Sequence, residues 1–155
     1  MTFIEFSGQM SMGLVLAGAT LGSALGIGAA GRAAAGAWAK EARAGKSLNF
    51  SYIILIGMPL SQTIYGFILM LVGLAPLIIG DQPMTTTHAG TLFGIGLAGG
   101  VAELSSAWMQ GLIGAAACRA ISEGEGKGLV FMIIAMGIVE TVGLFGFVFL
   151  LLVLP

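Results

Sequence analysis

Two carboxyl groups, those of Glu103 and Glu140, lie inside long apolar stretches of the sequence. A charged side chain at the centre of a bilayer costs about 2.5–3.5 kcal/mol or more, so such residues are functional candidates by default. Glu140 lies near the centre of the last stretch, and no basic residue lies at comparable depth in any of them. Glu140 is therefore expected to bind a proton or a metal cation, or to meet a cation on another subunit. The alternative is a permanently protonated acid that donates a hydrogen bond.

Further oxygen atoms that could join Glu140 lie on two other apolar stretches. Carboxylate, amide and carbonyl oxygens suit hard cations, and the sequence has no His or Cys cluster for zinc or copper. Pro59 has no backbone N–H and loosens the helix before it, so the carbonyl of Met58 could turn toward an ion. The candidate co-ligands are Ser61, Gln62, Gln110 and the Met58 carbonyl, with Tyr65 nearby. The alternative is that these polar side chains only join helices by hydrogen bonds.

The elements that must position these groups are membrane-spanning helices. The chain has 155 residues, of which 57% are hydrophobic and 8% charged, whereas soluble domains carry about 25% charged residues. A spanning helix needs about 20 apolar residues, while the strands of a membrane barrel would alternate apolar and polar residues. Four continuous stretches qualify, at about 10–36, 52–80, 88–118 and 127–154. The sequence therefore predicts an all-α membrane protein with four transmembrane helices.

The basic residues predict the orientation of these helices. All six lie in or beside the connections after the first and third helices, and none lies near either terminus or in the 81–88 turn. Basic loops remain in the cytoplasm, so both termini are expected on the outer side. Asp81 and His88 are then solvated residues of an external turn, and Trp38 is an interfacial anchor. No basic patch suits nucleic acid, and the first ten residues lack the basic region of a secretory signal.

The chain also looks like a duplicated helical hairpin. Similar Gly- and Ala-rich segments end the first and third helices, and Gly66 and Gly146 each lie between two aromatic residues. We expect two tandem hairpins, residues 1–80 and 81–155, in parallel orientation. Aligning the two glycines places Leu60 opposite Glu140, and a slip of two residues places Gln62 there. One carboxylate therefore remains per four helices.

Small residues distinguish the first and third helices from the bulkier second and fourth. Gly18, Gly22 and Gly26 recur every fourth residue in the first helix. The third helix carries a similar series, Ala98, Ala102, Ser106, Gln110, Gly114 and Cys118. Small residues at this spacing let helices approach closely in lipid. The pattern suits a ring with a tight inner layer and a bulky outer layer, or alternatively an ordinary compact bundle.

With these features the whole chain resembles the membrane-ring proteolipid, the K or c subunit, of V-type and archaeal-type rotary ATPases. The local motifs are residues 59–67, 110–117 and 139–141. The resemblance implies a lipid-embedded ring of identical copies that turns against a stator subunit with an essential arginine. A central-stalk subunit would meet the cytoplasmic loops, where Glu41, Glu123 and Glu125 lie. ATP would be hydrolysed or made in partner subunits, consistent with the lack of a P-loop in this chain.

The sodium-transporting members of that family imply a specific ligand set. They imply that Na⁺ is held by Glu140, Gln110, Ser61, Gln62 and the Met58 carbonyl, while Tyr65 hydrogen-bonds Glu140. Ser61 stands where the sodium pattern has Thr, which keeps the hydroxyl and loses a methyl group. Glu103 departs from the pattern as a second intramembrane carboxyl group. Its place on an inner helix favours the ring lumen or a contact between subunits, as a protonated acid bonded to a neighbour's Ser or Gly carbonyl. The alternative is that Glu103 takes part in ion binding as a second carboxylate.

Two other functions stay open from the sequence. A ring of the same family that carries H⁺ would need fewer oxygen ligands. A small stand-alone four-helix transporter should show a polar cavity or broken helices, of which only Pro59 is a sign. The depths of two predicted ligands do not match in the sequence. At 1.5 Å per residue, Gln110 lies about 13 Å from Arg119 while Glu140 lies about 20 Å from Lys127, so equal depth requires unequal protrusion of the helices.

Overall fold

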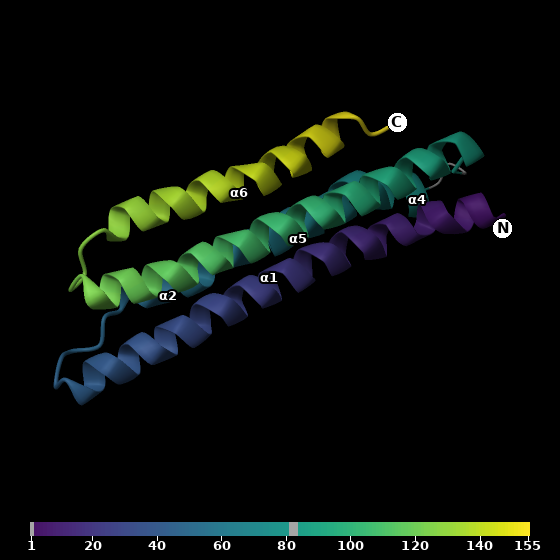
Figure 1. Ribbon diagram of the computed structural model, residues 1–155. Helices are drawn as coiled ribbons and strands as arrows, with labels where there is room; N and C mark the ends of the chain where they lie inside the picture. The colour runs from purple at the N-terminus through teal and green to yellow at the C-terminus, as the bar shows by residue number, and fades with distance from the viewer. Residues whose placement is uncertain (1, 81–83) are drawn as a thin grey trace.

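The computed structural model describes residues 2–80 and 84–155. Figure 1 shows a long, all-helical molecule whose helices run side by side. Its elements are α1 (Phe3–Arg43), α2 (Ser51–Gly57), the 3₁₀ turn η1 (Met58–Leu60), α3 (Ser61–Ile68), the π-helical η2 (Leu69–Leu74), α4 (Ala75–Ile79), α5 (Thr86–Glu123) and α6 (Leu129–Leu152). Asp81, at which the second predicted hairpin begins and which was expected in an external turn, lies outside the described residues.

Four helical stretches are long and apolar enough to cross a membrane, which confirms the predicted all-α membrane fold. They are Phe3–Arg43, Ser51–Ile79, Thr86–Glu123 and Leu129–Leu152, with mean hydropathies from 1.3 to 2.2. The second comprises α2 to α4 with the two irregular turns. Helices α1 and α5 are longer than their apolar stretches, because good helix formers continue them past the point where charged residues begin.

The helix ends have local causes. The Thr2 hydroxyl accepts from the Glu5 backbone N–H at 3.2 Å, and the Glu5 carboxylate accepts from the Thr2 N–H at 2.7 Å, which caps α1. Between α5 and α6, the turn includes Glu125, Gly126 and Gly128 in left-handed conformations, with φ of 54°, 88° and 87°. Such a short turn reverses the chain, so α6 runs back antiparallel along α5.

Helices α1 and α5 pack so closely that glycine is required between them. A Cβ at Gly22 would lie 2.5 Å from the Leu104 Cα, and one at Gly18 would overlap the backbone of Gly100. Both pairs are 82 residues apart, which equals the separation of Ala33 from Ala115 at the ends of the duplicated helices. Equivalent residues of the two hairpins therefore meet at the same depth, as expected for parallel repeats related by an axis along the bundle.

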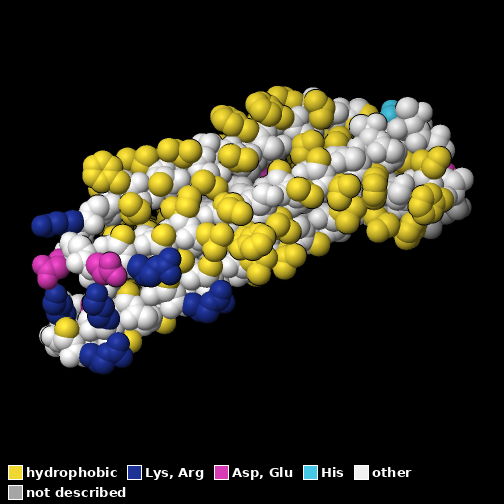
Figure 2. All heavy atoms as spheres, in the orientation of Figure 1, with side chains coloured by type: hydrophobic (Ala, Val, Ile, Leu, Met, Phe, Trp, Pro, Cys, Tyr) yellow, Lys and Arg dark blue, Asp and Glu magenta, His cyan; other side chains and the backbone are white. Residues whose placement is uncertain are grey.

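The bulky helices lie outside this pair and present apolar side chains to the surroundings. Figure 2 shows hydrophobic side chains over most of the visible face, with Lys and Arg gathered toward one end. Both termini lie at the opposite end (Figure 1). A predominantly apolar surface would aggregate in water but is the stable arrangement in lipid. The predicted orientation in the membrane rests on this arrangement, in which the basic residues lie at one end of the molecule and both termini at the other.

Candidate ion-binding site

The Glu140 carboxylate on α6 is held by donors from two other helices. The Tyr65 hydroxyl of α3 donates to Glu140 Oε1 at 3.1 Å, and the Gln110 amide of α5 donates to Oε2 at 3.2 Å. The same Gln110 Nε2 lies 3.2 Å from the Met136 carbonyl, one turn before Glu140. The Tyr65 ring stacks on Phe147, with ring centroids 5.8 Å apart. Three helices from both hairpins thus converge on one half-buried carboxyl group.

Pro59 shapes the helix that carries the next group of oxygens. It lies within η1, where the helical ladder tightens to a 3₁₀ turn. Proline lacks the N–H that would bond the carbonyl of Leu55, four residues earlier, so the helical hydrogen bonds are interrupted just before this turn. The Ser23 hydroxyl of α1 donates a hydrogen bond to the Pro59 carbonyl at 2.6 Å. The Ser61 hydroxyl is 3.1 Å from both the Met58 carbonyl and Gln62 Oε1, so these three predicted ligands adjoin one another.

A chain of hydrogen bonds connects this group of oxygens to the helix of Glu140. Gln62 is fully buried, and its amide donates to the Ser106 hydroxyl at 3.0 Å. Ser106 in turn donates to the Val139 carbonyl at 2.9 Å, next to Glu140 in the sequence. Ser106 and Ser23 were not predicted as site residues. Ser106 belongs to the small-residue series of the third helix, where packing alone explained it.

One acceptor in the site has no donor. Gln110 Oε1 is buried and has no hydrogen-bond partner among the described residues. A buried amide oxygen without a partner costs about 1–3 kcal/mol. Since the Gln110 nitrogen already faces Glu140, a cation held beside that carboxylate would supply the missing partner. The geometry therefore leaves an oxygen available where the sequence predicted a ligand.

The unequal helix depths implied by the sequence are resolved by the observed helix ends. Helix α5 continues to Glu123 and α6 begins at Leu129. At 1.5 Å per residue, Gln110 then lies about 20 Å before the end of α5, and Glu140 about 17 Å after the start of α6. The two residues reach the same depth without unequal protrusion. The apparent mismatch in depth arose because Arg119 and Lys127 were taken as the helix ends, whereas α5 ends at Glu123 and α6 begins at Leu129.

The expected location of Glu103 is wrong. Its side chain is only 1% exposed in the single chain, so it faces neither a lumen nor a neighbouring subunit. Glu103 Oε2 instead lies 2.8 Å from where a Cβ of Gly143 would be, against α6. No hydrogen bond reaches either of its carboxylate oxygens from the described residues. The helix turns Glu103 toward its own hairpin because it lies two turns from Gln110 on the same face.

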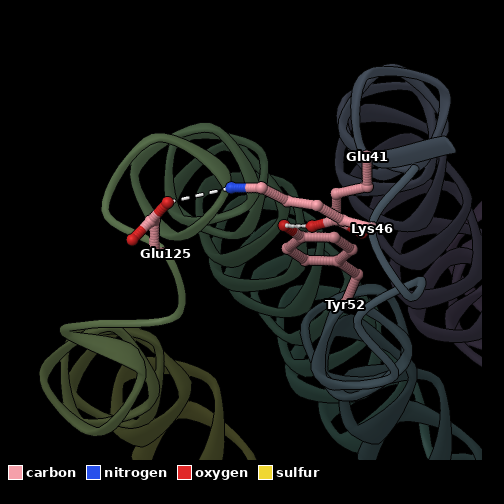
Figure 3. A network of polar contacts seen from close by, with 4 residues as sticks. All are labelled: Glu41, Lys46, Tyr52 and Glu125. Carbon is pink, nitrogen blue, oxygen red and sulfur yellow. Dashed lines mark hydrogen bonds and ion pairs between the residues drawn. The ribbon is translucent and has the colours of Figure 1, made fainter. Parts of the chain in front are cut away.

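The charged end of the molecule has a separate network, shown in Figure 3. The Glu41 carboxylate accepts from the Tyr52 hydroxyl at 2.6 Å and from the Asn49 N–H at 2.9 Å. Lys46 forms an ion pair with Glu125 at 2.9 Å. The bond to Glu125 raises the pKa of Lys46, and Lys46 in turn lowers the pKa of Glu125. Glu41 thus fixes the connection between α1 and α2, while Lys46 links that connection to the turn before α6.

Trp38 takes part in the same end of the molecule. Its indole N–H donates to the Asn49 carbonyl at 2.9 Å, and its ring meets that of Tyr52 edge to face. An indole with one polar contact and an apolar body suits the boundary of a membrane. His88 is exposed in the first turn of α5, and its backbone N–H donates to the Thr85 hydroxyl.

Comparison with known proteins gives the same duplication as the fold. The family model for the C subunit of ATP synthase matches the chain twice, over residues 10–72 and 93–153. No curated protein matches the chain closely enough to count as a relative. Each match takes in one helix rich in small residues and one bulky helix. The first contains Gln62 and Tyr65, and the second contains Gln110 and Glu140.

Proposed function

The chain belongs to the family of ATP synthase C subunits, and we propose that it is the Na⁺-carrying rotor-ring subunit of a V/A-type ATPase. Members of this family are integral membrane proteins that assemble as a ring with other ATPase subunits. The duplicated match and the four helices fit a ring subunit made of two fused hairpins. Family membership also disfavours the stand-alone transporter. What remains to be proposed is the ion, the residues that bind it and the partners that move it.

The observation that carries the proposal is the convergence of Tyr65 and Gln110 on Glu140. Both donors hold the carboxylate in one position, and the free Gln110 Oε1 is available to a cation beside it. Ser61, Gln62 and the Met58 carbonyl form a second group of oxygens, joined to α6 through Ser106. Several hard oxygen ligands suit a small metal cation such as Na⁺, whereas a proton needs only the carboxylate.

The mechanism follows from the position of Glu140 on an outer helix. Half-burial leaves its carboxylate within reach of a neighbouring protein, while Gln62 and Gln110 are buried inside the subunit. An arginine of a stator subunit would neutralise the carboxylate and allow the ion to leave. Tyr65 and Gln110 would keep the empty carboxylate in place until the next ion binds. Rotation of the ring would bring successive copies of Glu140 past the stator.

The proposed orientation places the charged end in the cytoplasm. Lys46 and Glu125 then lie on the side where a central stalk would bind the ring. Glu41 is already occupied by Tyr52 and Asn49, so its structural contacts leave it less available to such a partner. Glu123 is exposed and better placed for that contact, and Glu125 is exposed as well but pairs with Lys46.

Carbodiimide labelling of the purified ring, across pH and with or without sodium, tests this function. Such reagents modify protonated carboxyl groups in apolar surroundings. We expect labelling at Glu140, suppressed by sodium and absent in Glu140→Gln. Glu123→Gln, which changes an exposed carboxyl group on α5, is the matched control and should label as the unaltered protein does. Labelling that responds to pH but not to sodium would make H⁺ the coupling ion. No labelling at Glu140 would contradict an ion-carrying role.

A further inference from the structure

Glu103 is a buried carboxyl group that the proposed mechanism does not use. It lies on α5, two turns before Gln110, and both of its oxygens lack a hydrogen-bond partner among the described residues. It packs against Gly143 of α6, which lies one turn beyond Glu140. A second carboxyl group is therefore enclosed beside the candidate ion site, in the same three-helix contact.

Among the residues that the structure describes, no positively charged side chain bonds Glu103 to balance an ionised carboxylate. Between Glu5 and Arg32, α1 carries no ionisable side chain. The ionisable neighbours on the other packed helices are Tyr65 of α3 and Glu140 of α6, and neither is a cation. An isolated charge in such a medium is very unfavourable, and the group is neutralised instead. The neutralising cation must therefore be one that the protein binds.

The space around Glu103 favours the smallest cation. The Cβ position of Gly143 would lie 2.8 Å from Glu103 Oε2 and 2.9 Å from the Ser106 hydroxyl oxygen. A metal ion would need several ligand oxygens at about 2.3–2.6 Å, and no hydrogen-bond partner from the described residues reaches either carboxylate oxygen of Glu103. A proton needs only the carboxyl group itself, so these surroundings favour a proton.

We propose that Glu103 binds a proton of its own, so that each chain has two cation-binding carboxyl groups, Glu140 on α6 and Glu103 packed against α6 one turn further along. No hydrogen bond joins Glu103 to Ser106 in the structure, but Glu103 Oε2 and the Ser106 hydroxyl oxygen both lie within 3 Å of one point, the Cβ position of Gly143. A small rotation of the Glu103 side chain would let its O–H donate to Ser106, whose oxygen already accepts from Gln62 and donates to Val139. A hydroxyl has two acceptor lone pairs, so one remains free for Glu103. The proton would extend the hydrogen-bond chain from Glu103 to the helix of Glu140. This inference holds whether Glu140 carries Na⁺ or H⁺.

The stored proton keeps the position beside Glu140 neutral. An ionised Glu103 would add a second negative charge to the site and would tighten the hold on any cation at Glu140. A carrier must release its ion at each passage, so excess affinity would slow it. Glu103 in its protonated form supplies a hydrogen-bond donor without that charge.

Infrared difference spectroscopy on the purified ring tests the proposal, because a protonated carboxyl group has a carbonyl-stretch band that a carboxylate lacks. At neutral pH and in saturating sodium, we expect this band in the unaltered protein and in Glu140→Gln. It should disappear in Glu103→Gln and shift in frequency in Glu103→Asp, which keeps a carboxyl group if the amide does not assemble. Glu123→Gln is the control and should leave the band unchanged. A band unaffected by Glu103→Gln would overturn the proposal.

Sodium stoichiometry separates this proposal from the proposed function. We expect one bound sodium ion per chain in both the unaltered protein and Glu103→Gln, measured with radioactive sodium on the ring. Two ions per chain, falling to one in Glu103→Gln, would mean that Glu103 holds a metal ion and would refute the stored proton. If no sodium binds but the infrared band still depends on Glu103, the sodium function fails while the proton at Glu103 stands.

Discussion

Tyr65 and Glu140, which belong to different hairpins, are joined by a hydrogen bond of 3.1 Å between the tyrosine hydroxyl and the carboxylate. The first hairpin has no intramembrane acid of its own, yet it supplies a donor to the acid of the second. The two copies of the duplicated unit have thus become complementary, one carrying the carboxylate and the other orienting it.

Removing the Tyr65 hydroxyl should weaken ion binding without disturbing the fold. Tyr65→Phe keeps the ring that stacks on Phe147 and loses one hydrogen bond to a charged group, which contributes about 1.5–3 kcal/mol. We expect sodium affinity to fall by about 10- to 100-fold, measured by sodium protection against carbodiimide labelling. Tyr52→Phe is the matched control, because its hydroxyl bonds Glu41 at the charged end. Equal effects of both substitutions would contradict a direct role for Tyr65.

Substitution of the adjacent serines Ser105 and Ser106 tests whether the hydrogen-bond chain matters, or only the polarity of this part of α5. Ser106→Ala would leave the buried Gln62 amide without its acceptor and the Val139 carbonyl without its donor, at a cost of about 1–3 kcal/mol. We expect a lower thermal stability of the ring and weaker sodium protection at Glu140. Ser105→Ala removes an exposed hydroxyl that bonds only its own helix, at Val101. It should leave both measurements unchanged, and a parallel loss there would count against the proposed chain.

Close contact between α1 and α5 should make Gly18 intolerant of larger side chains. A Cβ at Gly18 already meets the Gly100 backbone, so Gly18→Val must push the two helices apart. Overpacking of this kind costs about 1–3 kcal/mol, occasionally more. We expect a lower yield of assembled ring in mild detergent and a lower melting temperature. Gly90→Ala is the control, because no atom of the described residues beyond the neighbouring helix backbone lies within 4 Å of its Cβ position, and wild-type assembly is expected there.

The Lys46–Glu125 ion pair should order the two loops only within a pH window. Lys46 lowers the pKa of Glu125. The stabilisation by the ion pair is therefore present above the pKa of Glu in the unfolded chain, and it is lost as pH falls through the lowered pKa of Glu125 in the folded protein. Glu125 raises the pKa of Lys46. The stabilisation by the ion pair is therefore full below the pKa of Lys in the unfolded chain, and it is lost as pH rises through the raised pKa of Lys46 in the folded protein.

Hydrogen exchange of the loop amides measures this window. At neutral pH, Glu125→Gln should speed exchange in residues 44–50, and the difference should vanish in acid. Because both side chains are largely exposed, at 56% and 73%, the effect should also shrink at high salt. Glu123→Gln, close by but outside the pair, should not change exchange. Persistence of the difference at acid pH would show that the ion pair is not its cause.

The sequence predicted the membrane fold because hydrophobicity and length suffice to identify spanning helices. It also singled out Tyr65, Gln110 and Glu140, since polar groups are few in apolar stretches, and the structure places these three in contact. Their binding of sodium stays a prediction. The orientation of Glu103 was missed, although its spacing of two helical turns from Gln110 places both side chains on the same face of the helix.

Other features depended on tertiary contacts that no local pattern encodes. Ser23 reaches the Pro59 carbonyl across 36 residues, and Ser106 bridges two helices. In the sequence both serines are simply small residues in helices rich in Gly and Ala. Helix ends were also misplaced, since the limits of hydrophobicity mark where a helix leaves the lipid, not where its backbone hydrogen bonds stop.

The pairing of equivalent residues at Gly18 and Gly100 has a consequence for the gearing of the proposed motor. Each chain contributes two similar hairpins to the circumference of a ring but only one acid at the position that the two hairpins share, Glu140. Such a ring would carry half as many ions per turn as one of equal girth with an acid in every hairpin. If the ATP turned over per revolution is the same, each ion could be driven against twice the electrochemical gradient. Loss of the acid from the first hairpin would then lower the number of ions moved per turn and raise the electrochemical gradient against which each ion can be moved.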